Sequence, residues 1–213
     1  MSTLCLGILP FGTTVDEKTS FAVLDRFAEA GGTFVDTADN YSIWAPGGRG
    51  GESEALLGRW MRVRGRRDET VVATKVGALP DPARGPEWPA NWQGLGAGTV
   101  RAGIENSLRR LGTDHVDVYY AHIEDPTVPM AETVGAFAAL ADEGLARVLG
   151  CSNHASTSVA TARQYAADHG LARYSCVQQR YTYLRPRPPP TAASASGTSP
   201  GRTWWSTSAP RTT

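Results

Sequence analysis

Residues 33–41 read TFVDTADNY, an apolar run that ends in an acid, with a tyrosine five positions after that acid. A buried β-strand that ends at Asp36 and exposes Tyr41 from the following loop would place a carboxylate and a phenol at one rim of a sheet. By itself the stretch favours a plainer interpretation, a strand followed by a turn, because Asp and Asn side chains hydrogen-bond nearby backbone in turns. The rest of the chain decides between the two.

The composition indicates one soluble globular domain. The chain has 213 residues, of which 41% are hydrophobic and 20% charged, and its 21 Lys and Arg balance its 21 Asp and Glu. A net charge of zero gives no electrostatic reason to expect nucleic acid or an anionic membrane as a partner. No apolar run approaches the ~20 residues that cross a bilayer, and the first ten residues lack the pattern of a signal peptide. We therefore expect a cytoplasmic protein.

The three cysteines are Cys5, Cys151 and Cys176, and no two of them have the spacing of a zinc or redox pair. Each falls in an apolar run of strand type, which predicts a small buried hydrophobic side chain at all three positions. The pattern fits a reducing compartment, and no metal site is predicted.

Apolar runs of strand type alternate with segments of helical periodicity along most of the chain. The first helix is expected to begin at a capping box at Thr14 and Glu17 and to end at Gly31. Strands are predicted at 4–9, 33–37, 70–75, 115–121, 145–150 and 174–178, and the later helices at 52–62, from 99 to 111, 130–142 and 156–169. With no hairpin signal between them, such units predict parallel strands joined by right-handed crossovers, in a barrel or an open sheet.

Polar groups at the strand ends distinguish these two folds. An open sheet gathers its ligand contacts at one switch point, whereas a barrel directs the carboxyl end of every strand to a common mouth. Five consecutive predicted strands end in polar or titratable residues: Asp36, Lys75, His122, Ser152 with Asn153, and Gln178. The sequence therefore favours an α/β fold of the (β/α)8 TIM-barrel type, incomplete, with about six βα units present.

Asp36, Tyr41, Lys75 and His122 together resemble the catalytic tetrad of the aldo/keto reductases. The resemblance extends to the motifs TFVDTADNY, GESEALLGRW, VVATKVG, SLRRLGTDHVDVYYAHIED, GLARVLGCSNH and VQQRYTYLRP, in the family's order and spacing, over about residues 4–186. It implies a reductase that converts aldehydes or ketones to alcohols with NADP(H), with NAD(H) as the alternative. It also implies that Ser152, Asn153 and Gln178 hold the nicotinamide carboxamide.

The chemistry of carbonyl reduction independently requires residues of the types found in this tetrad. Hydride addition needs a proton for the developing alkoxide, and a phenol with a pKa near ~10 is a poor acid at neutral pH unless a neighbour lowers that pKa. An ammonium group within ~4–6 Å stabilises the phenolate, and a carboxylate fixes the ammonium. We therefore assign Tyr41 as general acid, Lys75 as the group that tunes it and Asp36 as the partner of Lys75. His122 is assigned to orient the carbonyl oxygen.

Other candidate residues have plainer explanations. His115, His154 and His169 have no partners in the pattern, and we expect them to be structural or surface residues. Trp44, Trp88 and Trp92 lie on loops over the predicted mouth, where they would either shape a substrate pocket or pack on the barrel rim.

The resemblance stops after the sixth strand. From Arg185 onward the sequence contains no Leu, Ile, Val, Met or Phe and no acid, so we expect residues 1–184 to form a partial barrel and 185–213 a disordered tail. Phosphate-binding loops of such barrels commonly follow strands seven and eight, and the first and sixth strands would keep unpaired edges. Weak or absent turnover is therefore expected of this chain. The tail is interpreted as an out-of-frame ending, with a natural proline-rich tail as the alternative.

Two other function classes stay open. One is a nicotinamide-binding regulatory subunit without significant turnover, and the other is a non-functional fragment. For the enzyme, the expected partner is a small-molecule carbonyl substrate, while the sequence predicts no oligomeric state.

Overall fold

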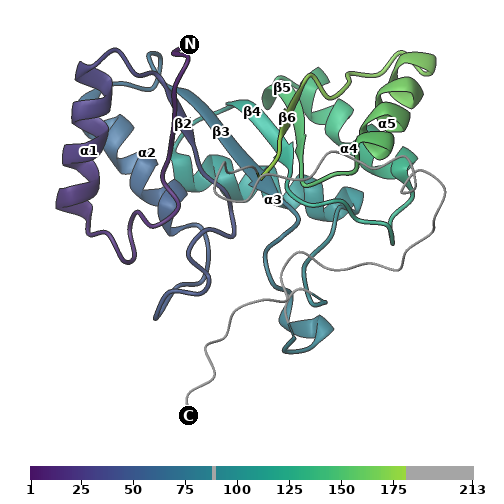
Figure 1. The fold of residues 1–213 in the computed structure, drawn as a ribbon, viewed down its shortest axis with the longest axis horizontal. Coiled ribbons are helices and arrows are strands. Elements are labelled where there is room, and N and C mark those ends of the chain that lie inside the picture. The colour runs from purple at the N-terminus through teal and green to yellow at the C-terminus, as the bar shows by residue number, and fades with distance from the viewer. Residues whose placement is uncertain (88–89, 181–213) are drawn as a thin grey trace, which may run out of the picture. The chain divides into compact units, whose positions relative to one another are not determined.

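The computed structural model describes residues 1–87 and 90–180, and residues 1–179 form one compact unit (Figure 1). Trp88 and the predicted tail at 185–213 lie outside the described residues, so the division at residue 184 stays a prediction. The strands are β1 (Cys5–Gly7), β2 (Phe34–Asp36), β3 (Val71–Val76), β4 (Val116–Ala121), β5 (Ala146–Ser152) and β6 (Cys176–Gln178). The helices are α1 (Glu17–Glu29), α2 (Glu52–Arg64), the short 3-10 helix η1 (Pro82–Arg84), α3 (Ala97–Leu111), α4 (Met130–Asp142) and α5 (Ser156–Asp168).

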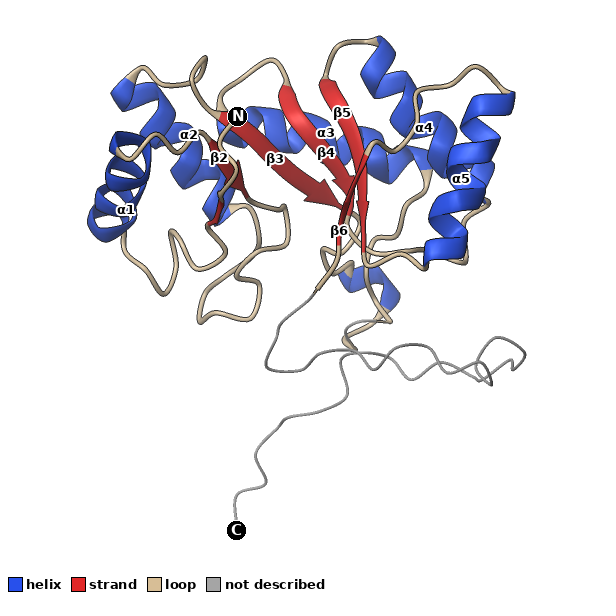
Figure 2. Cartoon of the chain, turned by 45° about the horizontal axis from the view of Figure 1, so that its top comes forward, coloured by secondary structure: helices blue, strands red, loops and turns tan. Residues whose placement is uncertain are grey.

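The strands form one six-stranded parallel sheet in the order β1-β2-β3-β4-β5-β6. Sequence neighbours are also neighbours in space, with no switch point, which is the order of a barrel and differs from that of an open doubly wound sheet. The sheet curls, and its helices cover the outer side (Figure 2). The predicted incomplete (β/α)8 barrel is thereby confirmed. Among the described residues, β1 and β6 each have one strand neighbour.

The core lies between the outer face of the sheet and the helices. Leu24 of α1, Leu56 and Leu57 of α2, Ile104 of α3 and Phe137 of α4 are fully buried in it. Burying such a side chain contributes about 1.5–3 kcal/mol each. A smaller apolar cluster of Ala73, Val118 and Tyr120 lies on the inner face of the curl. In the part of the chain that the structure describes, no helix is long and apolar enough to cross a membrane.

Apart from η1, which lies in a predicted loop, the element types and their order are as predicted, and most boundaries agree within two or three residues. The predicted cap of the first helix is wrong: Asp16, not Thr14, is the N-cap, and its carboxylate accepts a hydrogen bond from the Thr19 amide at 2.8 Å. Asp is a stronger N-cap than Thr because its charge also interacts favourably with the helix dipole.

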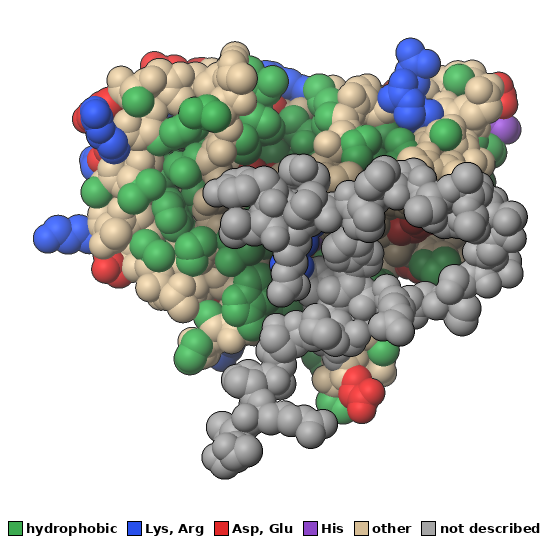
Figure 3. All heavy atoms as spheres, in the orientation of Figure 1, with side chains coloured by type: hydrophobic (Ala, Val, Ile, Leu, Met, Phe, Trp, Pro, Cys, Tyr) green, Lys and Arg blue, Asp and Glu red, His purple; other side chains and the backbone are tan. Residues whose placement is uncertain are grey.

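The prediction of three buried cysteines is correct only for Cys151. Cys176 is half-buried and Cys5 is exposed. Cys5 pairs with Phe34 in the β1–β2 register, so it lies on the inner face of the curl, away from the helices. Its strand has a neighbour on one side only among the described residues. On the face seen in Figure 3 hydrophobic side chains reach the surface, and the exposed hydrophobic residues include Leu4 and Val148.

The contact between α2 and α3 depends on Gly58. A Cβ at this position would lie 2.6 Å from the carbonyl oxygens of Arg110 and Leu111. We therefore expect Gly58→Ala to lower the free energy of unfolding by about 1–3 kcal/mol, because backbone must move to make room. Chemical denaturation measures this loss.

Gly135→Ala in α4 is the matched control, since nothing lies within 4 Å of its ideal Cβ. That variant should gain about 0.5–1 kcal/mol from helix propensity. Equal effects at the two positions would show that the close approach of α2 and α3 is not a constraint.

Candidate active site

A buried ion pair connects β2 and β3. Asp36 ends β2 and pairs with Ala73, and Lys75 lies two residues further along β3, so both side chains point to the inner face of the curl. The Lys75 ammonium lies 2.8 Å from Oδ1 and 2.7 Å from Oδ2 of Asp36. Lys75 is only 1% exposed and Asp36 5% exposed. The carboxylate is therefore the counter-ion of an otherwise isolated buried charge.

Tyr41 completes this cluster from the loop after β2. Its hydroxyl lies 2.7 Å from Lys75 Nζ, which donates to it, and itself donates to Asp36 Oδ2 at 3.0 Å. The ammonium also donates to the carbonyl oxygen of Thr37 at 2.7 Å. The two predicted neighbours in TFVDTADNY thus meet at one point with Lys75, which the plainer interpretation of a strand and turn does not require.

Hydrogen bonds fix the loop that carries Tyr41. Ser42 has φ of 67° and donates to the carbonyl of Leu9 at 2.6 Å. On the other side of Tyr41, the Asn40 amide donates to the Ala78 carbonyl at 3.3 Å. The loop is therefore tied to the chain segments that follow β1 and β3. Because Ser42 adopts a left-handed conformation that costs energy outside glycine, its bonds hold a strained backbone directly beside the phenol.

A chain of two buried hydroxyls anchors the side chain of Thr37, the residue whose carbonyl accepts from Lys75. Thr37 Oγ1 lies 2.7 Å from Ser53 Oγ, and Ser53 in turn donates to the carbonyl of Ile8 at 2.9 Å. Both side chains are fully buried. This chain connects β1, β2 and α2 immediately behind the ammonium group, so the acceptor of Lys75 cannot move independently of the core.

His122 follows the last residue of β4 and faces Tyr41, with ring centroids 6.1 Å apart in a T-shaped arrangement. Its Nδ1 is enclosed and has no hydrogen-bond partner within the described residues. Burial, and then the charge of Lys75, holds the pKa of His122 well below its usual range. The imidazole is therefore neutral at neutral pH.

The pKa of Tyr41 shifts in the direction opposite to the expected lowering. Burial, followed by the charge of Asp36 and the hydrogen bond to it, raises the pKa of Tyr41. The expectation of a lowered pKa considered the ammonium but neither the burial of the phenol nor the charge of the carboxylate beside it. Burial also lowers the pKa of Lys75, against the opposing effect of Asp36. Tyr41 therefore keeps its proton at neutral pH.

Three further predicted residues lie at the carboxyl ends of β5 and β6. Ser152 and Gln178 are register partners and face the inner side, as Lys75 does. Asn153 follows with φ of 54°, and its amide donates to the His122 carbonyl and to Ser152 Oγ, each at 3.0 Å. The Ser152 hydroxyl proton and the Gln178 amide make no hydrogen bond to other described residues. This set offers both donors and acceptors, which a primary carboxamide requires, so the residues fit a nicotinamide.

The remaining histidines have structural contacts, as predicted. His154 lies with Nδ1 2.7 Å from the Ser152 carbonyl, His115 pairs with Asp114, and His169 stacks on Tyr165. Trp44 is 62% exposed and Trp92 partly buried. These exposures do not distinguish the predicted role of the two tryptophans in a substrate pocket from the alternative of packing on the barrel rim.

The sequence does not predict a buried polar network behind the cluster. Glu54 of α2 is fully buried, accepts from Thr74 Oγ1 and pairs with Arg110 of α3 at 2.6 Å. Asp39 is also buried, directly after the Asp36 strand. Glu54 lies three residues before the buried Leu57 and therefore on the same face of α2. This spacing could have predicted that Glu54 is buried. Nothing comparable marks Asp39, because an acid in a loop normally faces solvent.

The fold and this site define a parallel half-barrel with a buried Lys–Asp–Tyr cluster at the carboxyl ends of its strands. The aldo/keto reductase family model matches residues 3–193. The chain therefore belongs to the aldo/keto reductase family, a family of oxidoreductases.

Several curated proteins are similar to the chain. It is 37% identical over 185 residues to norsolorinic acid reductase B of Aspergillus parasiticus, covering 84% of this chain and 47% of that protein. Over 189 residues it is 35% identical to an aryl-alcohol dehydrogenase of Pestalotiopsis microspora, covering 85% and 47%. It is also 35% identical over 186 residues to the uncharacterized oxidoreductase YrpG of Bacillus subtilis, covering 86% and 55%. The chain thus spans about half the length of the curated relatives it matches.

The neutral His122 predicts a pH dependence of stability. A histidine whose folded-state pKa is lowered binds fewer protons when folded than when unfolded, so stability falls as pH drops below the unfolded pKa of about 6.5. Between pH 7 and about 5, the His122→Asn variant should therefore lose less unfolding free energy than the unmodified chain. His154, whose pKa burial also lowers, contributes to the remaining loss.

Denaturation at a series of pH values measures this effect. The control is the exposed His169, and His169→Asn should leave the pH dependence unchanged. If His122→Asn had the same pH dependence as the unmodified chain, a neutral buried imidazole at this position would be ruled out.

Proposed function

We propose that this protein reduces an aldehyde or ketone to an alcohol with a nicotinamide cofactor, and that Tyr41 delivers the proton. The observation that carries the proposal is the cluster at the Lys75 ammonium, which lies within 2.8 Å of both Asp36 oxygens and of the Tyr41 hydroxyl. A phenol, an ammonium and a carboxylate in mutual contact are the parts that proton delivery to an alkoxide requires.

Proton delivery follows from the geometry of the cluster. The raised pKa keeps Tyr41 protonated before reaction, so a proton is available when negative charge develops on the carbonyl oxygen. As that proton leaves, the phenolate forms 2.7 Å from Lys75 Nζ. The hydrogen bond from the ammonium then strengthens because its acceptor has become charged. Lys75 thereby stabilises the product of proton transfer more than the reactant, which is the requirement for catalysis.

His122 is proposed to orient the carbonyl oxygen. A neutral imidazole is a hydrogen-bond donor that does not add a second positive charge beside Lys75. Its ring faces Tyr41, so a carbonyl oxygen between the two rings would receive hydrogen bonds from both. Once the Tyr41 hydroxyl turns from Asp36 to this oxygen, the two donors would lower the barrier by electrostatic stabilisation of the developing alkoxide.

Ser152, Asn153 and Gln178 are proposed to hold the nicotinamide of NADP(H), with NAD(H) as the alternative. When bound, the cofactor supplies the hydride that adds to the carbonyl carbon. The Asn153 amide group is already engaged with His122 and Ser152, so its Oδ1 is the atom that would accept from the carboxamide. These bonds also couple the nicotinamide residues to the backbone that carries the carbonyl-orienting histidine.

The proposed substrate class is an aryl aldehyde or ketone. It is supported by relatives named norsolorinic acid reductase and aryl-alcohol dehydrogenase. The inner face of the curl adds Tyr120, whose ring lies 5.9 Å from Lys75 Nζ. An aromatic residue beside the cluster favours an aromatic substrate through ring contacts.

Substitution of the proton donor tests this proposal. Tyr41→Phe should lower alcohol formation from benzaldehyde and NADPH by about 10²–10⁴-fold, because the ring remains while the transferable proton is lost. The proposed function requires measurable turnover, whereas the sequence alone left weak or absent turnover open, and chromatographic detection of benzyl alcohol registers turnover even when it is weak. NADPH binding should be unchanged.

Tyr165→Phe on α5 is the matched control and should keep the parent activity, since the Tyr165 ring stacks on His169 and packs against the core, and Phe preserves both contacts. Equal alcohol formation by Tyr41→Phe and the parent chain would exclude Tyr41 as the donor. Complete absence of alcohol with the parent chain would contradict the proposed activity itself.

A further inference from the structure

A polar cavity of about 380 Å³ lies apart from the catalytic cluster. The cavity is partly open to solvent, and its lining includes Asp39 from the loop after β2, Leu79, Asp81 and Gln93 from the loop after β3, and Asn106 and Arg110 of α3. Tyr41, Lys75 and His122 do not line it. Its volume is within the range of small-molecule sites.

The charges around the cavity leave one acid without a partner. Asp81 pairs with Arg84 at 3.7 Å, and Arg110 pairs with Glu54 at 2.6 Å. Both lining arginines are therefore already matched. Asp39 is only 3% exposed, and its Oδ1 has no hydrogen-bond partner among the residues that the structure describes. An ionised Asp39 would be a buried charge without an ion-pair partner, compensated only in part by the Asn40 backbone amide and the more distant charges of Arg110 and Lys75, which is unfavourable.

Burial without an ion-pair partner changes the ionisation of Asp39. Burial, and then the nearby charge of Glu54, raises the pKa of Asp39 to about 8, and Arg110 offsets only part of the increase. At pH 7 about a tenth of the molecules therefore carry an ionised Asp39. A positive group in the cavity would supply the missing partner, favour the carboxylate and displace its proton.

We propose that this cavity binds a small cation, either an organic ammonium group or a monovalent metal ion, through the carboxylate of Asp39. Gln93, Asn106 and Thr99 add neutral polar groups to the lining, and these can solvate a cation without adding charge. The proposal does not depend on the carbonyl-reductase activity, because none of the catalytic residues takes part.

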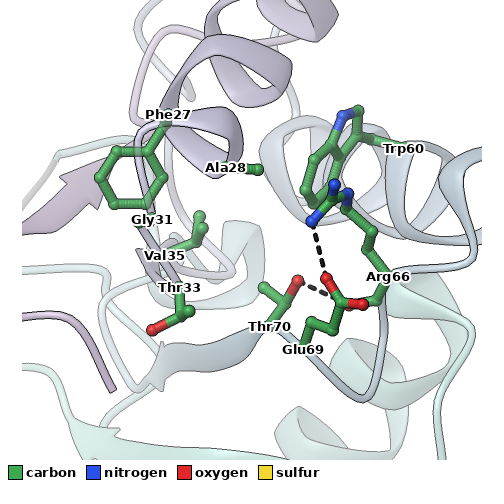
Figure 4. Close-up of a pocket in the computed structure, with 10 residues that line it drawn as sticks. Phe27, Ala28, Gly31, Thr33, Val35, Trp60, Arg66, Glu69 and Thr70 are labelled. Carbon is green, nitrogen blue, oxygen red and sulfur yellow. Dashed lines mark hydrogen bonds and ion pairs between the residues drawn. The ribbon is translucent and has the colours of Figure 1, made fainter.

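A second cavity, of about 210 Å³ near α1 and α2, shows the contrasting case (Figure 4). Its charged lining residues, Arg66 and Glu69, point toward each other and pair at 2.7 Å. The indole of Trp60 donates to Asp25 at 2.8 Å. No acid that lines this cavity is left without a partner, so its charges do not require a ligand.

Proton release on binding tests the proposal directly. The chain is titrated at pH 7 with methylammonium chloride or potassium chloride, in a weakly buffered tetramethylammonium chloride background of fixed ionic strength. At least one probe should release protons saturably, approaching one per chain, since most of Asp39 is protonated beforehand. The apparent affinity should rise about tenfold from pH 7 to pH 9. The two probes distinguish an ammonium ligand from a metal ion.

Asp39→Asn should abolish the release, and Asp81→Asn, in the same cavity, should leave it unchanged because Asp81 is already paired with Arg84. The absence of saturable release with both probes would overturn the proposal, and so would equal release by Asp39→Asn. The titration of the unmodified chain decides the matter even if Asp39→Asn fails to fold.

Discussion

The buried ion pair between Lys75 and Asp36 is the interaction on which the rest of the site depends. An ammonium group taken out of water loses several kcal/mol of hydration, and the protein must replace its hydrogen bonds. Here the replacement comes from both Asp36 oxygens, the Thr37 carbonyl and the Tyr41 hydroxyl, all within 2.8 Å. Each of these oxygens is itself fixed, by the β2–β3 register or by the loop that carries Tyr41. The desolvated charge therefore dictates where the phenol lies.

The barrel topology makes this arrangement possible. In-order parallel strands bring the ends of β2, β3, β4 and β5 to one side of the curl, and each strand contributes one polar group there. Burial and the ion pair together shift two pKa values in opposite directions. Burial, and then the charge of Lys75, lowers the pKa of His122 and favours a neutral ring, while burial, and then the charge of Asp36, raises the pKa of Tyr41. The proposed acid and the proposed orienting donor thus hold the protonation states that carbonyl reduction requires.

Much of the fold was predictable because strand ends carry polar residues and glycines end the helices, as Gly112 does in its left-handed conformation after α3. Among the four candidate catalytic residues, Asp36, Lys75 and His122 stood out because each ends or directly follows an apolar run. Tyr41 lies in a loop five positions after Asp36, and only the resemblance to the family motif singled it out. What the sequence could not predict depends on three-dimensional packing. Asp39 resembles a solvated loop acid, and the exposure of Cys5 depends on the sheet face and on the number of strand neighbours. The direction of the Tyr41 pKa shift depends on the burial of the phenol and on its contact with Asp36, neither of which the sequence reveals.

The claim that the ion pair organises the site is tested most directly by a double-mutant cycle. The unfolding free energy is measured for Asp36→Asn, Lys75→Met and the double variant. Each single change leaves the other charge buried and unpaired, at a cost of about 3–5 kcal/mol. If the pair organises the site, the double variant loses less than the sum of the singles, with an interaction energy of about 2 kcal/mol or more. Additivity within about 0.5 kcal/mol would contradict it.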